Sequence, residues 1–224
     1  AVWLLYSADH LVDARTIKGT ASTDRHRFYQ SHFRELTLVA SVASVLLLVL
    51  LAGVRSEVVK AGMFLSIGIV PYLLFHVRLF ALKEIIGAVL YTAGAMLPVI
   101  VSHHFEFELF QVLATVAFLL TAYYNLILFA WFDLETDRKD NLPSIGWSMP
   151  GKRLYAVVLI VGLCAVTVSA VLVLVYDQPH YKVLLLMDVL LTAIILFPVH
   201  FRVNYRFRLL GDAVFVLPAL LAFL

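Results

Sequence analysis

The stretch LTLVASVASVLLLVLLAGV, from Leu36 to Val54, contains 19 residues and no charged side chain. An α-helix of this length rises about 28 Å, which is close to the hydrocarbon thickness of a bilayer. Similar apolar runs recur along the chain, whereas a transmembrane β-barrel would show polar residues at alternating positions. The sequence therefore predicts a polytopic bundle of membrane-spanning α-helices.

The composition agrees with a membrane protein. Hydrophobic residues make up 62% of the 224 residues, charged residues make up 14%, and the mean hydropathy is +0.95. These values are too apolar for a soluble domain of this length and indicate contact with membrane lipids. The net charge of +2 comes from basic residues in short loops, and no basic arm suited to nucleic acid is present. Cys164 is the only cysteine, so a disulfide or zinc–thiolate framework is excluded.

About eight membrane helices are expected, and the first is incomplete. The opening run, Ala1 to Leu11, is too short to cross a bilayer, so we expect upstream sequence to be missing. No low-complexity segment or linker interrupts the chain, which predicts a single domain over residues 1–224. The other predicted helices span residues 36–54, 58–77, 85–101, 109–132, 154–176, 183–201 and 209–224.

Two pairs of aspartates stand out at the ends of apolar runs. Asp9 and Asp13 form one DxxxD pair, and Asp133 and Asp137 form the other. Four residues of helix turn through about 400°, so the two carboxylates of each pair are expected to share one helix face. Like charges one turn apart repel each other, and something positive should compensate. One such pair is usually a solvated helix end, but two pairs favour a functional site.

Helix alternation places both acidic pairs on the same side of the membrane. It also places 14 of the 17 Lys and Arg residues on that side, leaving only Arg55, Lys60 and Lys182 on the other. Short cytoplasmic loops carry an excess of Lys and Arg. We therefore predict that both acidic pairs face the cytoplasm.

Paired carboxylates with flanking Arg and Lys are typical of a site that holds a diphosphate. Mg²⁺ is usually bound by one or two carboxylates together with phosphate oxygens, and Arg and Lys neutralise the remaining charge. A polar site at the end of an apolar bundle suits a ligand with an anionic head and a hydrocarbon tail. These features point to an isoprenyl diphosphate.

The two motifs resemble those of the UbiA-type intramembrane prenyltransferases. The second motif of that family, DxxxD, is matched by Asp133 and Asp137, and the first is followed by a basic stretch, as Asp24-Arg25-His26-Arg27 follows Asp9 and Asp13 here. The family writes its first motif Asn-Asp-x-x-Asp-x-x-x-Asp. This chain has Leu5 and Tyr6 at the first two positions and matches the other two.

The resemblance implies about nine helices around a central cavity and Mg²⁺-dependent transfer of a prenyl group from an isoprenyl diphosphate to a lipophilic acceptor. It also implies three sets of site residues. The metal ligands and catalytic residues would be Asp9, Asp13, Asp133 and Asp137; the diphosphate-binding residues Arg25, Arg27, Lys83, Arg138 and Lys139; and the cavity residues Tyr6, Tyr124 and Asn125.

Two other functions remain open. A membrane terpene cyclase would use the same metal site without an acceptor. A non-catalytic lipid-binding protein or a transporter would explain buried acids without a metal, although a transporter is expected to carry charges at the membrane midplane, whereas these pairs lie at helix ends. Asp188 and Asp212 lie in or near apolar runs, so each is expected to face the protein interior or to be functional.

Overall fold

A computed structural model describes residues 2–75, 79, 82–102 and 108–223, and these residues contain helices and no strand. The predicted all-α class is therefore confirmed for the described part of the chain, while the predicted helix ends at Val77 and Leu224 lie outside it. The helices are α1 (Val2–Thr16), α2 (Asp24–Ser31), α3 (Phe33–Leu51), α4 (Ser56–Phe75), α5 (Lys83–Ser102), α6 (Leu109–Phe132), α7 (Leu134–Lys139), η3 (Ile145–Trp147), α8 (Gly151–Tyr176), α9 (Pro179–Leu196), α10 (Pro198–Arg202), η4 (Val203–Tyr205), α11 (Arg206–Ala213) and η5 (Val214–Phe223).

Six helices are long and apolar enough to cross a membrane, namely α3, α4, α5, α6, α8 and α9. They coincide with six of the eight predicted runs to within a few residues at most ends. The count of eight is not confirmed. The last predicted helix, 209–224, falls within α11 and the 3₁₀ segment η5, which contains Pro218, a residue that cannot donate a helical hydrogen bond.

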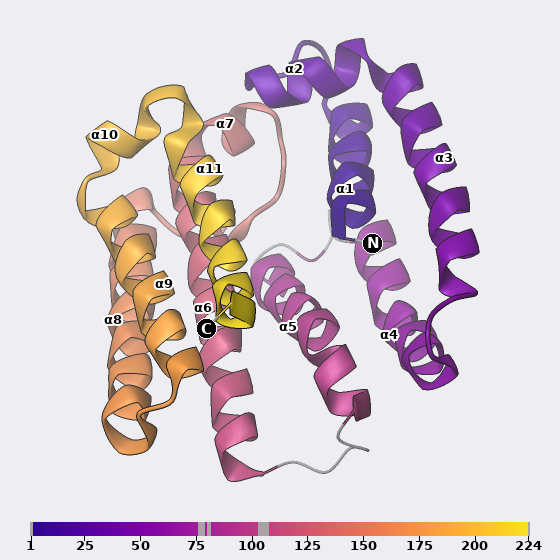
Figure 1. Cartoon of the computed structure of the whole chain (residues 1–224). Coiled ribbons are helices and arrows are strands. Elements are labelled where there is room, and N and C mark those ends of the chain that lie inside the picture. Colours follow the sequence, from indigo (N-terminus) through magenta and orange to yellow (C-terminus); the bar gives the residue numbers. More distant parts are fainter. Residues whose placement is uncertain (1, 76–78, 80–81, 103–107, 224) are drawn as a thin grey trace. The chain divides into compact units, whose positions relative to one another are not determined.

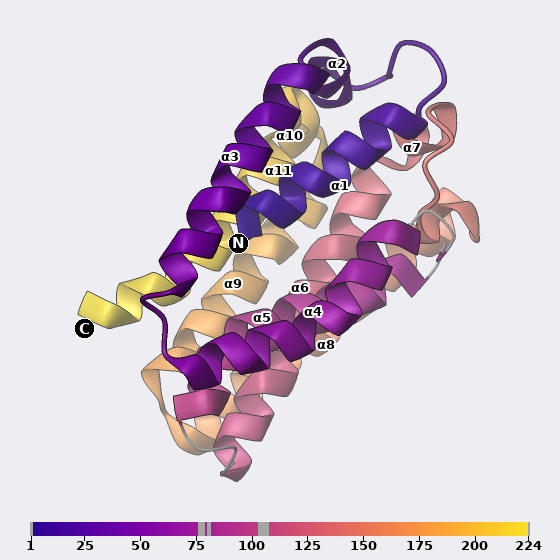
Figure 2. The ribbon, with the colours of Figure 1, turned by 90° about the vertical axis from the view of Figure 1, so that its right-hand side faces the viewer.

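The chain divides into two compact units, which we describe separately. The first unit comprises residues 1–80 and 135–143. In it α1 packs against α2 and α3, as Figure 2 shows. A small apolar core formed by Ile17, Ala21 and Leu142 joins the chain after α1 to the segment after α7. No residue of α3, which is described throughout, is buried.

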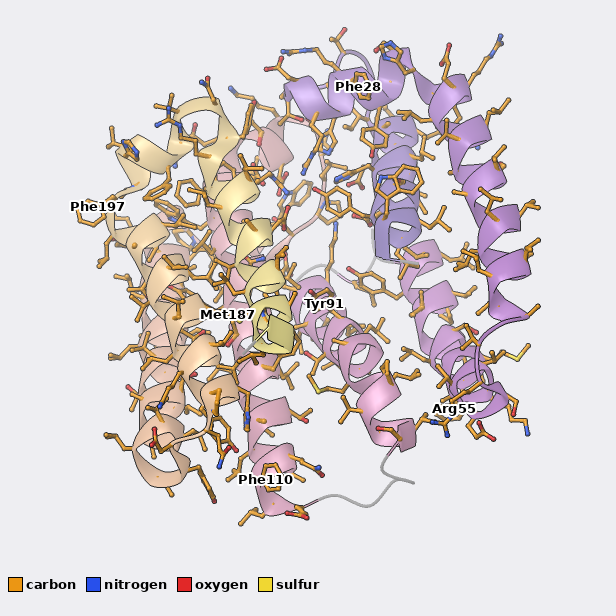
Figure 3. All side chains as sticks on the ribbon, in the orientation of Figure 1. Phe28, Arg55, Tyr91, Phe110, Met187 and Phe197 are labelled. Atoms are coloured by element: carbon orange, nitrogen blue, oxygen red, sulfur yellow. The ribbon has the colours of Figure 1, made fainter. Side chains whose placement is uncertain are left out.

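The second unit comprises residues 81–134 and 144–224. Its core is built from α6, α8 and α9, and α8 runs beside α9 in Figure 1. Figure 3 labels Met187, which is fully buried in this core, and Phe197, which projects outward and is 64% exposed. Apolar side chains therefore occupy both the interior and the outer surface, as in a protein whose solvent is lipid.

The outward-facing side chains of the long helices support the same conclusion. Leu48 on α3 is 67% exposed, Phe64 on α4 is 78% exposed and Leu174 on α8 is 84% exposed. Burying a side chain of this size away from water is worth about 1.5–3 kcal/mol, so a bilayer would stabilise these helices strongly. The described chain is thus an integral membrane protein in contact with lipid.

Candidate functional site

The first acidic pair lies on an uninterrupted helix, as predicted, so Asp9 and Asp13 share one face of α1. Next to this pair the structure gathers a cluster of buried polar side chains. His10 and Asp13 from α1 and His26 from α2 each offer a ligand atom, and these three atoms lie within 4.8 Å of one another. The three residues are only 4%, 5% and 2% exposed. We call this group the His–Asp cluster.

Local hydrogen bonds hold α2 in place beside α1. Thr23 caps α2 by accepting a hydrogen bond from the backbone N–H of His26. The side chain of Gln30 donates to the carbonyl of Gly19 and accepts from the N–H of Ala21. Gly19 has φ +95°, a conformation that costs glycine little. The chain can therefore turn sharply after α1, and this turn places His26 of α2 close to α1.

Asp140 belongs to this site, although the sequence analysis did not single it out. Its two carboxylate oxygens accept hydrogen bonds of 2.9 and 3.0 Å from the N–H of Ser22, and its Oδ2 lies 3.7 Å from Nδ1 of His26. Asp140 is 7% exposed. The signal that could have found it is its position three residues after Asp137, which continues the second acidic motif.

Arg25 contacts both His26 of the His–Asp cluster and Tyr6, which stands at the second position of the first motif. Its Nη1 donates to the Tyr6 hydroxyl at 3.4 Å, and its Nη2 lies 3.3 Å from Nε2 of His26. A guanidinium has only donors, so Nε2 accepts this hydrogen bond. His26 then carries its proton on Nδ1, which faces Asp140. Arg25 thus contacts Tyr6 and His26 in the first unit, while the predicted roles of Arg25 in diphosphate binding and of Tyr6 in the cavity stay predictions.

The other four predicted diphosphate ligands lie on α2, α5 and α7. Arg27 is exposed, pairs with Asp24 and contacts the carbonyls of the preceding turn. Arg138 and Lys139 are exposed in the last turn of α7. Lys83 begins α5 in the second unit. The diphosphate-binding role of these four cations stays a prediction.

The second acidic pair does not lie on one continuous helix, so the shared helix face expected for its carboxylates is not established and stays a prediction. Asp133 is the C-cap of α6, with φ −90° and ψ 0°, and Asp137 lies on the separate helix α7. The backbone leaves the α conformation at Asp133, so the four-residue spacing no longer guarantees a shared face. Asp137 belongs to the first unit and Asp133 to the second.

In the second unit Asp133 is held by an arginine that the sequence analysis had counted only as an orienting charge. Arg208 of α11 forms an ion pair and hydrogen bond with the Asp133 carboxylate. Its guanidinium also lies over the rings of Phe129 and Phe207, 5.1 and 5.7 Å from their centroids. Nothing in the local sequence marks this pair, because the two residues are 75 positions apart.

The two predicted cavity residues on α6 point in different directions. Tyr124 is fully buried, and its hydroxyl donates to Thr192 of α9 at 3.3 Å. Asn125 is also buried, and its Oδ1 would lie 2.8 Å from a Cβ placed on Gly211 of α11. The cavity role of both residues stays a prediction.

The two isolated aspartates differ from each other. Asp188 on α9 is fully buried and accepts a hydrogen bond of 2.6 Å from Ser169 of α8, so it faces the interior as expected. Asp212 on α11 is exposed. The buried Asp188 thus links two membrane helices.

Comparison with known proteins found no family model, no curated protein and no solved structure that matches this chain.

Proposed function

We propose that this protein transfers a prenyl group from an isoprenyl diphosphate to a lipophilic acceptor within the membrane, as its motif resemblance to UbiA-type prenyltransferases implies. One observation supports this proposal above the others. The first unit gathers the first acidic motif, the basic helix α2 and the segment after the second acidic motif, through Arg25–Tyr6 and Asp140–Ser22 hydrogen bonds. A polar cluster attached to apolar helices suits an amphiphilic anion.

The carboxylates of this chain fit Mg²⁺ to different degrees. Mg²⁺ takes oxygen ligands and is commonly held by one or two carboxylates plus substrate phosphates. Asp9 and Asp137, both partly exposed in the first unit, meet this requirement best. Asp13 lies beside two imidazoles and Asp133 is held by Arg208, so both would join the metal only after rearrangement. When bound, Mg²⁺ would neutralise diphosphate oxygens.

The cations and aromatic residues would act on the two products of ionisation. When the C–O bond breaks, the diphosphate takes the electron pair and an allylic cation remains. Arg25 would stabilise the departing diphosphate, aided by Arg27, Lys83, Arg138 and Lys139. The ring of Tyr6, 42% exposed and one turn from Asp9, would stabilise the allylic cation through its face.

We also propose that both acidic motifs face the cytoplasm, which is supported by the excess of Lys and Arg on their predicted side. In a Cys164→Ser background, Arg15→Cys and Arg138→Cys, at exposed positions next to the two motifs, should both be labelled from the cytoplasmic side of oriented vesicles. Labelling of the two from opposite sides would refute the topology.

The function is tested by incubating the protein in its full natural length, in lipid nanodiscs, with Mg²⁺, labelled isoprenyl diphosphates of several lengths and a membrane lipid extract. We expect release of diphosphate and a labelled lipid-soluble product. Asp137→Asn and Arg25→Ala should each lower the rate by at least about tenfold, the size expected when one charge-stabilising contact is removed. Arg55→Ala is the matched control, because Arg55 is exposed and predicted on the opposite side.

The outcomes separate the alternatives. Diphosphate release without incorporation into any acceptor, together with a cyclised hydrocarbon, would identify a terpene cyclase. If no diphosphate is released from any substrate while the labelled lipid binds, the hypothesis of a non-catalytic lipid-binding protein or transporter replaces the proposal.

A further inference from the structure

The His–Asp cluster has a chemical character that differs from a magnesium site. Two of its three donors are imidazole nitrogens, which suit zinc, iron, copper and nickel, whereas Mg²⁺ prefers oxygen. Two histidines and one carboxylate are the protein ligands of many open zinc and non-haem iron sites. We propose that His10, Asp13 and His26 bind one divalent transition-metal ion, a site separate from the Mg²⁺ ligands Asp9 and Asp137.

The geometry is close to that of a metal site. Ligand atoms about 2.1 Å from a tetrahedral ion lie about 3.4 Å from one another, and the three atoms here lie within 4.8 Å. Small side-chain rotations would close this difference. All three side chains are more than nine-tenths buried, so they meet the ion with little competing water.

The surroundings hold the imidazoles in place. The ring of His10 packs edge-on against Tyr6 and Tyr29, with ring centroids 4.2 and 5.2 Å away. Asp140 faces Nδ1 of His26 at 3.7 Å and is itself fixed by the N–H of Ser22. A carboxylate that accepts a hydrogen bond from a metal-binding imidazole fixes its tautomer and raises the basicity of the other nitrogen. The 3.7 Å between Asp140 and His26 is longer than a hydrogen bond, so Asp140 would take this role after a small shift toward His26.

This arrangement makes Arg25 a competitor of the metal. With its proton on Nδ1, His26 offers Nε2 to the ion, and Nε2 lies 3.3 Å from Nη2 of Arg25. A cationic guanidinium at this nitrogen both occupies its lone pair and repels a dication. Metal binding therefore requires Arg25 to move away, and removal of Arg25 should strengthen metal binding.

Metal binding is tested on the chelator-treated, tag-free chain in detergent, with Co²⁺ as a spectroscopic probe and Zn²⁺ content measured after dialysis. We expect one ion per chain, retained in millimolar Mg²⁺, with loss of stoichiometric binding in Asp13→Asn and His26→Gln. Asp140→Asn should weaken binding about 10- to 100-fold, the range for second-shell ligands. His200→Gln is the control, since His200 is exposed in the second unit.

The two arginines of α2 provide the sharpest comparison. Arg25→Ala should tighten Co²⁺ binding, whereas Arg27→Ala should leave it unchanged, because Arg27 is exposed and contacts Asp24 and two backbone carbonyls. If the cluster variants fail to fold, pulsed EPR of Cu²⁺ bound to the wild-type chain still decides the matter, because imidazole suits Cu²⁺ and two coordinated histidine nitrogens give a characteristic modulation.

The proposal is overturned if no stoichiometric Co²⁺ or Zn²⁺ binds, if the ion persists in Asp13→Asn and His26→Gln, or if bound Cu²⁺ shows no histidine nitrogen. It is independent of the proposed prenyl transfer, because no prenyl diphosphate enters the test. Failure of prenyl transfer would leave the Co²⁺ result standing, and failure of Co²⁺ binding would leave the Mg²⁺-dependent reaction standing.

Discussion

Gly162 in the middle of α8 allows Tyr124 of α6 to pack directly against the helix backbone. A Cβ at residue 162 would lie 2.5, 2.6 and 2.9 Å from Cζ, Oη and Cε2 of Tyr124. Carbon atoms in favourable contact are about 3.5–4.0 Å apart, so the ring would have to retreat by about 1 Å. Tyr124 is fully buried and its hydroxyl is bonded to Thr192, which leaves the ring little room.

The substitution Gly162→Ala should therefore destabilise the protein. Overpacking a filled core costs about 1–3 kcal/mol, and loss of the Tyr124–Thr192 hydrogen bond adds about 0.5–1.5 kcal/mol. The gain in helix propensity, about 1 kcal/mol, is cancelled by comparing Gly162→Ala with Gly62→Ala on α4. A Cβ at Gly62 meets nothing within 4 Å. We expect Gly162→Ala to be about 2–4 kcal/mol less stable than this control.

Thermal unfolding in detergent measures the difference. For a chain of this size each kcal/mol corresponds to about 2–4 °C, so the two variants should differ in Tm by roughly 5–15 °C. Replacing Tyr124 with Leu in the Gly162→Ala background should recover part of the loss. Equal Tm values for Gly162→Ala and Gly62→Ala would refute the close approach of the two helices.

Three further predictions use the same unfolding assay. Ser169→Ala should cost about 1–3 kcal/mol, because a buried carboxyl oxygen of Asp188 loses its donor; unchanged stability would mean that the bond is not formed. Arg208→Ala and Asp133→Asn should be non-additive, with a coupling free energy of about 0.5–3 kcal/mol, and full additivity would exclude the ion pair. Gly211→Ala should cost about 1–3 kcal/mol, since its Cβ would lie 2.6 Å from a ring atom of α6; a neutral effect would show that α11 does not pack there.

Many features of this protein could be predicted from local patterns. A run such as Leu36 to Val54 has a single low-energy conformation in a bilayer, because every backbone hydrogen bond must be made within the segment. Six membrane helices were therefore found with ends close to those observed. The shared face of Asp9 and Asp13 followed in the same way from the regular geometry of one helix.

The same reasoning failed where a helix ended. Asp133, with φ −90° and ψ 0°, separates α6 from α7, so the relative placement of Asp133 and Asp137 no longer follows from the geometry of one regular helix. The apolar segment 209–224 likewise resembled a membrane helix by composition, but α11 ends at Ala213 and a 3₁₀ segment follows. Hydropathy indicates which segments are apolar enough to lie in a membrane, but it does not indicate where the backbone of such a segment leaves the α-helical conformation.

The sequence by itself determined the class of this protein, the positions of its long helices and the residue types available for chemistry, because each depends on neighbours within a few turns of the chain. Only the tertiary structure decided which of those residues meet. In the folded chain His26 lies close to His10 and Asp13, Asp140 lies next to His26, and Asp133 forms an ion pair with Arg208. The last two pairings join residues 114 and 75 positions apart along the chain, and such contacts depend on how whole helices pack, which no local pattern encodes.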